Sequence, residues 1–466
     1  MSNLIIESIG NGIDRLAQLA DNPTIDYQQV AIYGSWLLTT FEVYLYKQQL
    51  KQYDIKVIPT ELVEHLPRET FDKSQAYGRD KTRYSLIKKV FDQILSVLLI
   101  QFGLFTKMWD WSGVCITKLG LSDDRIITRS LIWTIIYVAI STPIGIPWDY
   151  FYTFVLEEKH GFNKSTVKLW WIDKAKTMAL MAVLGLPIWG AFLWIINWAG
   201  KDFVPWLMLF MIVIQLSMQI IYPIFIQPLF NKLTPLPDGE VRTRVEVLAN
   251  KLGFPLKHLY EIDGSKRSSH SNAYFYGLPW NKHIVIFDTL MEQSTPAEVE
   301  AVLGHELGHW YLSHPSKLLL IGNLHLLFTL TLFAVFIHNT TLYKSFGFDP
   351  SLALDGPRGP PANVIGFTLF QLLLEPLDAP VKFLFNSITR KYEYQADEFG
   401  VKLDKRQELK TALTKLHVKN LSSPYNDALY SMYHHSHPTL TERLRALDEY
   451  KDDGKPLKIK SEKKEL

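Results

Sequence analysis

The sequence predicts a mainly α-helical protein that crosses a membrane about seven times and carries a small α+β domain outside the bilayer. Two observations lead to this fold class. Hydrophobic residues make up 47% of the 466 residues, and they are gathered into long apolar runs separated by charged stretches. One region between these runs instead has short stretches of helical or alternating periodicity, which is typical of a mixed domain in water.

Seven apolar runs of about 17–25 residues are long enough to cross a bilayer as helices. The second run is the least clear, because Lys88, Lys89 and Asp92 stand beside it, and a buried amphipathic helix would explain it as well. The runs are centred on residues 29–46, 90–107, 127–147, 178–199, 203–226, 317–338 and 363–385.

These runs divide the chain into four parts. Residues 1–227 contain the first five runs with cytosolic loops, and residues 228–316 form the mixed domain. Residues 317–386 contain the last two runs, and residues 387–466 supply the C-terminal part of the mixed domain and a basic tail. We therefore expect the mixed domain to be assembled from two segments that membrane helices separate in the sequence.

The mixed domain has its own periodicities. Residues 241–252 have the pattern of a helix, and residues 258–262 and 283–287 have that of strands. Between the strands lies Gly264–Gly277, whose second half alternates polar and aromatic residues, as an edge strand does. An edge strand can bind an extended peptide by strand addition, but a surface hairpin would explain the pattern equally well.

The distribution of Lys and Arg predicts the orientation, because cytosolic loops of membrane proteins are rich in them. An N-terminus outside the cytosol and a C-terminus inside it satisfy every loop except the mildly basic 118–129. Asn339-Thr340-Thr341 would then be a glycosylation sequon in the lumen. The basic segments are 47–89, 159–176 and the tail after residue 390.

The composition excludes several classes of protein. A formal net charge of +2 and a pI near 8.2 indicate no nucleic-acid partner. The lone Cys115 excludes an internal disulfide. The polar character of the N-terminal region predicts no cleavable signal peptide.

The motif His-Glu-x-x-His at residues 305–309 carries the chemistry of the mixed domain. Residues four apart lie on one face of a helix, so His305 and His309 can bind one metal ion. Glu306 can then reach a water molecule at the metal. This combination is the ligand pair and general base of a zinc peptidase, and the alternative is a chance match on an amphipathic helix.

The ends of the motif helix are also signalled. Thr295 and Glu298 form the pattern of a capping box, and Pro296 occupies the first helical position. Pro315 predicts the end of the helix.

The third metal ligand cannot follow the motif directly. A third histidine six residues after the second would stand where Pro315 stands, and His314 is out of register. Glu393 and Asp397 are four apart and fit a His/His/Glu site, with Asp397 accepting the N–H of a ligating imidazole. Glu398 is a competing carboxylate on a different helical face.

A second cluster of histidines lies near the C-terminus. His434, His435 and His437 stand within four residues, a few positions before Arg443. They can form a polar cluster that binds a substrate carbonyl or stabilises an oxyanion. The alternative is a loop before a helix, with Arg443 in a structural ion pair.

Polar residues within the last two apolar runs have two explanations as well. At membrane depth they either pair between helices or line a hydrated chamber. They are Asn323, His325, Gln371, Glu375, Asp378 and Lys382.

Four blocks together closely resemble the type I CAAX prenyl proteases, a family of eukaryotic zinc metalloproteases, and the likeness covers nearly the whole chain. The resemblance implies seven membrane helices around a water-filled chamber, capped by a zincin-like (gluzincin) catalytic domain. The blocks are Gly264–Gly277, His305–Trp310, Glu393–Asp397 and Ser436–Leu444.

The resemblance also implies roles for individual residues. One Zn²⁺ would be held by His305, His309 and Glu393. Glu306 and Asp397 are the candidate catalytic residues, Glu306 as the base and Asp397 at a second acidic position, for which we prefer a role behind the ligands. The positions expected near the substrate are Asn272, His437 and Arg443.

The implied substrates are proteins that end in a farnesylated or geranylgeranylated Cys-a-a-X sequence. The last three residues would be removed, and some members also make a second cut upstream. The implied location is the endoplasmic reticulum membrane or the nuclear envelope, in contact with lipid and with the catalytic domain in the cytosol. Lys463-Lys464-Glu465-Leu466 resembles a dilysine retrieval signal, although a generic basic tail explains it too.

Two rival interpretations make different predictions. A site-2-type intramembrane protease would take its third ligand from Leu354-Asp355-Gly356, but that segment is predicted on the opposite side of the membrane. A transporter with a structural zinc would need a closed site, which is usually rich in cysteine. The His/His/Glu set with an adjacent Glu306 favours an enzyme.

Overall fold

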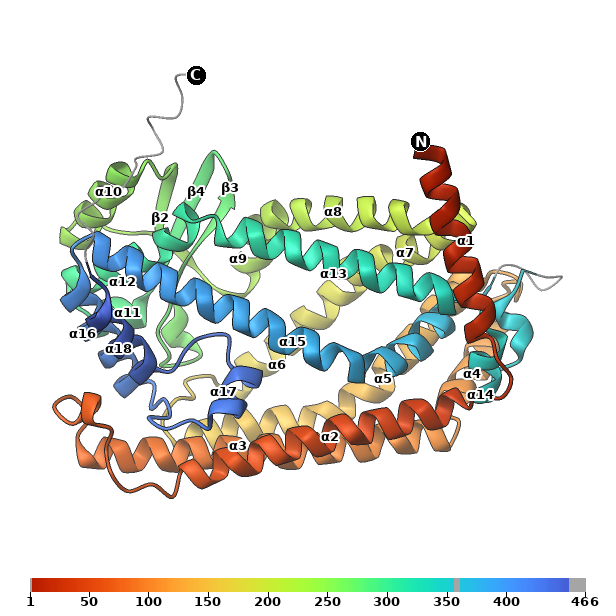
Figure 1. The fold of residues 1–466 in the computed structure, drawn as a ribbon, viewed down its shortest axis with the longest axis horizontal. Helices are drawn as coiled ribbons and strands as arrows, with labels where there is room; N and C mark the ends of the chain where they lie inside the picture. Colours follow the sequence, from red (N-terminus) through yellow and green to blue (C-terminus); the bar gives the residue numbers. More distant parts are fainter. Residues whose placement is uncertain (1, 356–360, 452–466) are drawn as a thin grey trace.

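The computed structural model describes residues 2–355 and 361–451, without the side chains of residues 2–9. Long helices run along the length of the molecule, and the mixed domain lies at one end of them (Figure 1). The tail residues 463–466, which carry the predicted retrieval signal, lie outside the described residues.

The first half of the chain is helical apart from short connections. α2 and α3 pack side by side along one edge of the molecule, and α7 and α8 along another (Figure 1). The helices are α1 (Ser2–Ala20), α2 (Tyr27–Gln52), α3 (Arg68–Gln101), α4 (Leu104–Lys118), α5 (Ile126–Phe151), α6 (Val167–Leu180), α7 (Leu186–Ala199), α8 (Phe203–Ile221) and α9 (Gln227–Phe230).

Among the described residues, four helical runs are long and apolar enough to cross a membrane, and the bent pair α3–α4 is a fifth candidate. Val167–Phe230 doubles back between α7 and α8, and α2, which holds the first predicted run, is not one of the four. The count of seven therefore stays a prediction. The four are Ile126–Glu157, Val167–Phe230, His314–Phe336 and Asn363–Lys402.

The second predicted run, at residues 90–107, is not one straight helix. α3 ends at Gln101, α4 begins at Leu104, and the two axes differ by 61°. Gly103 between them has φ +59°, a left-handed conformation that glycine adopts without a steric penalty. The apolar pattern continued through this position, so hydropathy alone gave no sign of the bend.

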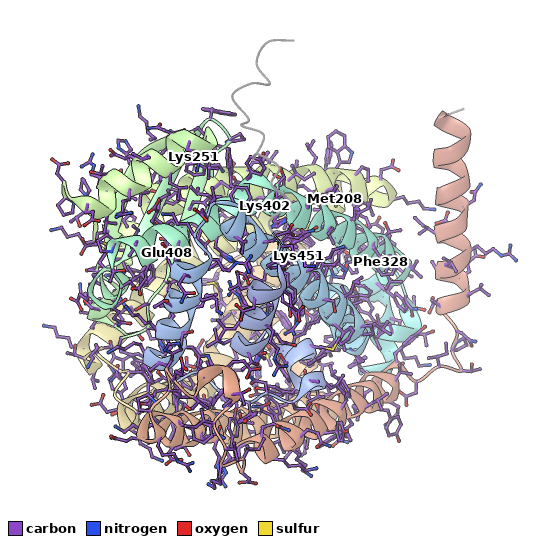
Figure 2. All side chains as sticks on the ribbon, turned by 60° about the vertical axis from the view of Figure 1, so that its left-hand side comes forward. Met208, Lys251, Phe328, Lys402, Glu408 and Lys451 are labelled. Atoms are coloured by element: carbon purple, nitrogen blue, oxygen red, sulfur yellow. The ribbon has the colours of Figure 1, made fainter. Side chains whose placement is uncertain are left out.

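The membrane helices bury little of their surface against one another. In Ile126–Glu157 only 11% of the most apolar stretch is buried, and in Asn363–Lys402 33%. Most of these side chains therefore face lipid or the space between the helices. Figure 2 shows Met208 of α8 and Phe328 of α13 (His314–Phe336) on this part of the molecule, whereas Lys251, Lys402 and Glu408 belong to the other end.

The mixed domain is built on a four-stranded sheet with the order β1-β2-β4-β3. β2 and β4 are parallel, and the other two pairs are antiparallel. The predicted strands and the predicted helix are confirmed. β3 is an edge strand and also forms a hairpin with β4, so both explanations of its alternation hold. The bounds are β1 (Leu233–Pro235), α10 (Glu240–Leu252), β2 (Leu256–Ile262), β3 (Ala273–Leu278), β4 (Asn281–Phe287) and α11 (Asp288–Gln293).

The motif helix α12 (Pro296–Tyr311) packs on this sheet and against the last membrane-crossing helix, α15 (Asn363–Lys402). A single apolar core joins them, with Ile284 and Ile286 from β4, Leu303 and Leu307 from α12, and Phe399 from α15. The remaining helices of the chain are α14 (Thr340–Ser345), α16 (Arg406–Lys419), α17 (Ala428–His434) and α18 (Leu440–Glu449).

Two local predictions about helix ends and modification need correction. α12 has the predicted capping box, but it ends at Tyr311, and Pro315 belongs to the first turn of α13. Asn339 does not fit a glycosylated residue, because it is 2% exposed and its side chain accepts a hydrogen bond from the Leu342 amide at 2.7 Å. An enzyme could not reach this side chain in the folded protein.

Candidate metal centre and active site

Two helices bring three ligand atoms to one point. His305 and His309 lie one turn apart on α12, and Glu393 faces them from α15. The Nε2 atoms of the two histidines are 3.2 Å apart. Glu393 Oε2 lies 3.4 Å from His305 Nε2, and Oε1 lies 3.3 Å from His309 Nε2.

These distances fit a zinc ion. With zinc–ligand bonds of about 2.0–2.1 Å, the ligand atoms of a tetrahedral site lie about 3.3–3.4 Å from one another. Glu393 Oε2 is buried and has no hydrogen-bond partner among the described residues, which a cation between the three side chains would supply. Three protein ligands leave one tetrahedral position open, as catalytic zinc sites do.

Asp397 forms a hydrogen bond with the first ligand, His305, on the side of the ring away from the metal position. Its Oδ1 lies 2.9 Å from His305 Nδ1, so the N–H sits on Nδ1 and leaves the Nε2 lone pair for a metal. Burial alone would lower the pKa of His305, but hydrogen bonds to Asp397 and Glu393 outweigh it and raise the pKa to about 9. The site therefore favours a positive charge at this position.

Arg443 completes this arrangement from α18. Its guanidinium is 10% exposed and donates to both oxygens of Asp397, at 2.8 and 2.6 Å. Its third nitrogen lies 3.7 Å from Glu393 Oε2. The described contacts of Arg443 at this centre are with Asp397, Glu393 and, at 3.3 Å, His305 Nδ1, and its predicted place near the substrate stays a prediction.

The second ligand, His309, also has a hydrogen-bond partner behind it, and the sequence did not reveal this partner. His314 Nδ1 lies 3.0 Å from His309 Nδ1, and His314 Nε2 lies 3.0 Å from Gln395 Oε1. Because the Gln395 oxygen can only accept, His314 Nε2 donates, and its Nδ1 must accept the N–H of His309. The chain Gln395–His314–His309 therefore fixes the tautomer that leaves His309 Nε2 free for a metal.

The turn after α12 explains how His314 reaches this place. Ser313 has φ +60°, so the chain reverses in a left-handed residue before α13 begins. His314 is 1% exposed and stacks on Tyr392, with ring centroids 4.2 Å apart. The only signal in the sequence is the nearness of His314 to the motif, and its spacing there does not suit a ligand.

Glu306 follows His305 on α12. Burial raises its pKa, and the positive charges of His305 and His309 oppose that shift. A carboxylate with a raised pKa is a better general base near neutral pH than an exposed one.

Of the residues predicted near the substrate, His437 lies at the edge of this centre. His437 Nε2 is 3.3 Å from Glu393 Oε1, and its side chain is 61% exposed. Arg390 of α15 holds its backbone by donating to the His437 carbonyl at 3.0 Å. Asn272 is exposed and directly precedes β3, the edge strand.

The rival third ligand is far from this centre. Asp355 is exposed in the loop before α15. Figure 1 shows this loop at the end of the molecule opposite α12. The zinc-ligating group found among the described residues is the one formed by His305, His309 and Glu393.

Comparisons with known proteins agree with this geometry. Residues 49–232 match a family model described as CAAX prenyl protease N-terminal, five membrane helices, and residues 235–451 match peptidase family M48. The chain is 39% identical to CAAX prenyl protease 1 of Saccharomyces cerevisiae, over 93% of this chain and 98% of that protein.

A human relative and a solved structure extend the likeness. The CAAX prenyl protease 1 homolog of Homo sapiens is 36% identical, over 89% of this chain and 95% of the relative. The crystal structure of S. mikatae Ste24p superposes with a TM-score of 0.85 at 40% identity, covering 91% of this chain and all of that one.

Proposed function

The chain belongs to the CAAX prenyl proteases of peptidase family M48, which makes it a multi-pass membrane zinc metalloprotease, and from this premise we propose its reaction in detail. It removes the last three residues of proteins that end in a prenylated Cys-a-a-X sequence, by hydrolysis of the peptide bond after the cysteine. A second cut upstream of the cysteine belongs to the same proposal. The joint geometry of His305, His309 and Glu393 is the observation that carries it.

The zinc ion, when bound, supplies a Lewis acid that polarises the scissile carbonyl and lowers the pKa of the attacking water. His305, His309 and Glu393 hold it. Asp397 and His314 keep both imidazoles in the ligating tautomer.

Glu306 moves the proton. It accepts a proton from the attacking water and donates it to the leaving amine, so that it ends the cycle unprotonated. Its raised pKa supports this role, because the carboxylate must both gain and lose a proton near neutral pH.

The substrate binds beside β3. A peptide that adds to the free edge of this strand would pass Asn272 and reach the metal position with its backbone extended. His437, exposed and 3.3 Å from Glu393, stands where it can donate to the oxyanion that develops on the scissile carbonyl. For Asp397 and Arg443, burial and mutual pairing support a positioning role.

The location belongs to the proposal as well. We infer an endoplasmic reticulum or nuclear envelope protein whose catalytic domain and C-terminus are cytosolic, in contact with membrane lipid. The Lys and Arg bias of the loops supports this orientation.

Cleavage of a farnesylated Cys-a-a-X peptide by the reconstituted full chain tests this function. We expect release of the last three residues, loss of release with a zinc chelator, and little cutting of the unprenylated peptide. Glu306→Gln should retain zinc while turnover falls by about 10²–10⁴. Equal cutting of both peptides would remove prenyl specificity, and cleavage by the Glu306→Gln variant would remove the assigned base.

A further inference from the structure

A cavity of about 560 Å³ opens beside the metal centre, and the hydrolysis of a peptide bond does not by itself account for it. It lies between α3, α17, the loop after α16 and His270, which precedes β3. His437 forms part of its wall and also lies 3.3 Å from Glu393, so this side chain connects the cavity with the metal position. Its volume is in the range of sites that hold small molecules or short peptides.

The wall of this cavity has an unusual chemistry. Among its described residues there is no Asp or Glu, and the only fully charged side chain is Lys81 of α3. Hydroxyl and amide groups of Thr82, Ser422, Ser423 and Asn420 stand around it. These uncharged groups can donate hydrogen bonds as well as accept them, and the fully charged side chain on the wall is positive.

The histidines of the wall add donors without adding negative charge. They are His270, His417, His434, His435 and His437. Burial lowers the pKa of His417, His434 and His435 to about 4, so these rings are neutral near pH 7 and each keeps one N–H.

The acidic group that attracts the charge of Lys81 is Glu157, which is hydrogen-bonded to another side chain. Glu157 lies behind the wall, where its Oε1 accepts from the Tyr77 hydroxyl at 2.7 Å and its Oε2 lies 3.6 Å from His270 Nε2. The Lys81 ammonium stands 4.8 Å from the centre of the Tyr77 ring, and no salt bridge within 4 Å is formed by it in the described chain. Its remaining donor capacity is directed to the cavity that it lines.

We propose that this cavity binds the C-terminal carboxylate of the substrate, with Lys81 as its charged partner. The proposal rests on the proposed function, because the substrate of that reaction carries a free carboxylate three residues beyond the scissile bond. Three extended residues span about 10 Å, so the carboxylate reaches a cavity that starts at His437.

The direction of the edge strand agrees with this assignment. A peptide paired antiparallel to β3 has its C-terminal end at Ala273, the first residue of the strand. The chain before Ala273 leads back to His270, which lines the cavity. A peptide that crosses the metal position in this direction therefore points its last residues toward Lys81.

The test compares two farnesylated peptides that differ only at the C-terminus, one a free acid and one an amide. Charge-assisted hydrogen bonds are worth about tenfold to hundredfold in binding. We expect the wild-type full chain in lipid to cut the acid with a kcat/KM at least tenfold above that of the amide. Lys81→Met should bring this ratio close to one, and Lys81→Arg should restore part of it.

The controls separate the possible failures. Lys73→Met changes an exposed lysine on the same helix, and its ratio should equal that of the wild type. Zinc content and melting temperature show whether the Lys81 variants fold. The carboxylate assignment is overturned if the wild type has an acid-to-amide kcat/KM ratio near one, or if Lys81→Met keeps the wild-type ratio. Either result leaves the proposed function standing. If the wild type cuts neither peptide, the proposed function and this inference both fall.

Discussion

The partner of the second metal ligand offers the most direct test of the site's construction. His314 holds His309 through their Nδ1 atoms at 3.0 Å and is itself held by Gln395 at 3.0 Å. Replacing His314 by Phe keeps the stacking on Tyr392, where the ring planes differ by only 5°, and removes both hydrogen bonds. The change therefore separates packing from tautomer control.

The expected cost follows from the geometry. Without His314, the His309 N–H is left unpaired in a buried place, and either ring nitrogen can carry the proton. Loss of such a partner typically weakens metal binding by about 10- to 100-fold, or about 1.4–2.7 kcal/mol. The wild-type fold should persist, because an aromatic ring of similar size fills the same space.

Competition with a chromophoric chelator measures the zinc affinity of purified protein. We expect His314→Phe to bind zinc 10- to 100-fold more weakly and to regain most of its activity when zinc is added in excess. Gln395→Leu, one step further from the metal, should show a smaller loss. Wild-type zinc affinity in His314→Phe would mean that the ring only packs, and the inferred tautomer chain would be wrong.

Two further predictions concern the charges behind the metal. Arg443→Met should lower the free energy of unfolding by about 3–5 kcal/mol, because it leaves Asp397 buried without its cation. The double variant Arg443→Met with Asp397→Leu should recover part of this loss in thermal unfolding. No recovery in the double variant would argue against a direct pair. In the metal-free protein, the pKa of His305 is raised to about 9 from its usual 6.5, so its contribution to stability is complete below pH 6.5 and is lost as the pH rises to 9. Zinc must displace that proton, so zinc affinity should rise with pH up to about 9 and level off above it. Calorimetric titrations at several pH values measure this affinity, and an affinity that does not change with pH would contradict the assignment.

Several features of the site could be read from local patterns. The four-residue spacing of His305 and His309 placed both rings on one helical face, and the same spacing brought Glu393 and Asp397 to one face of α15. The capping box at Thr295 and the edge strand after Asn272 followed from equally short patterns. Each of these statements concerns the face or the end of a single element.

Other features depended on contacts between elements. Gly103 bends the helical path by 61° in an apolar stretch that hydropathy treats as continuous. Asn339 matches a sequon, yet its side chain caps α14 and is buried. His314 was set aside because its spacing did not suit a ligand, and its actual role needed the left-handed turn at Ser313.

The sequence by itself determined which residues could share a face and which segments could cross a membrane, because helical and strand periodicities are properties of consecutive residues. Only the tertiary structure decided that Arg443 faces Asp397, that Gln395 and His314 stand behind His309, and that Lys81 shares a cavity with the histidines of the C-terminal loop. Apart from His314 and His309, the partners in these contacts lie far apart in the sequence, and their meeting depends on how α3, α12, α15 and α18 pack together. No short pattern encodes that packing, since it is the combined result of every interface in the fold.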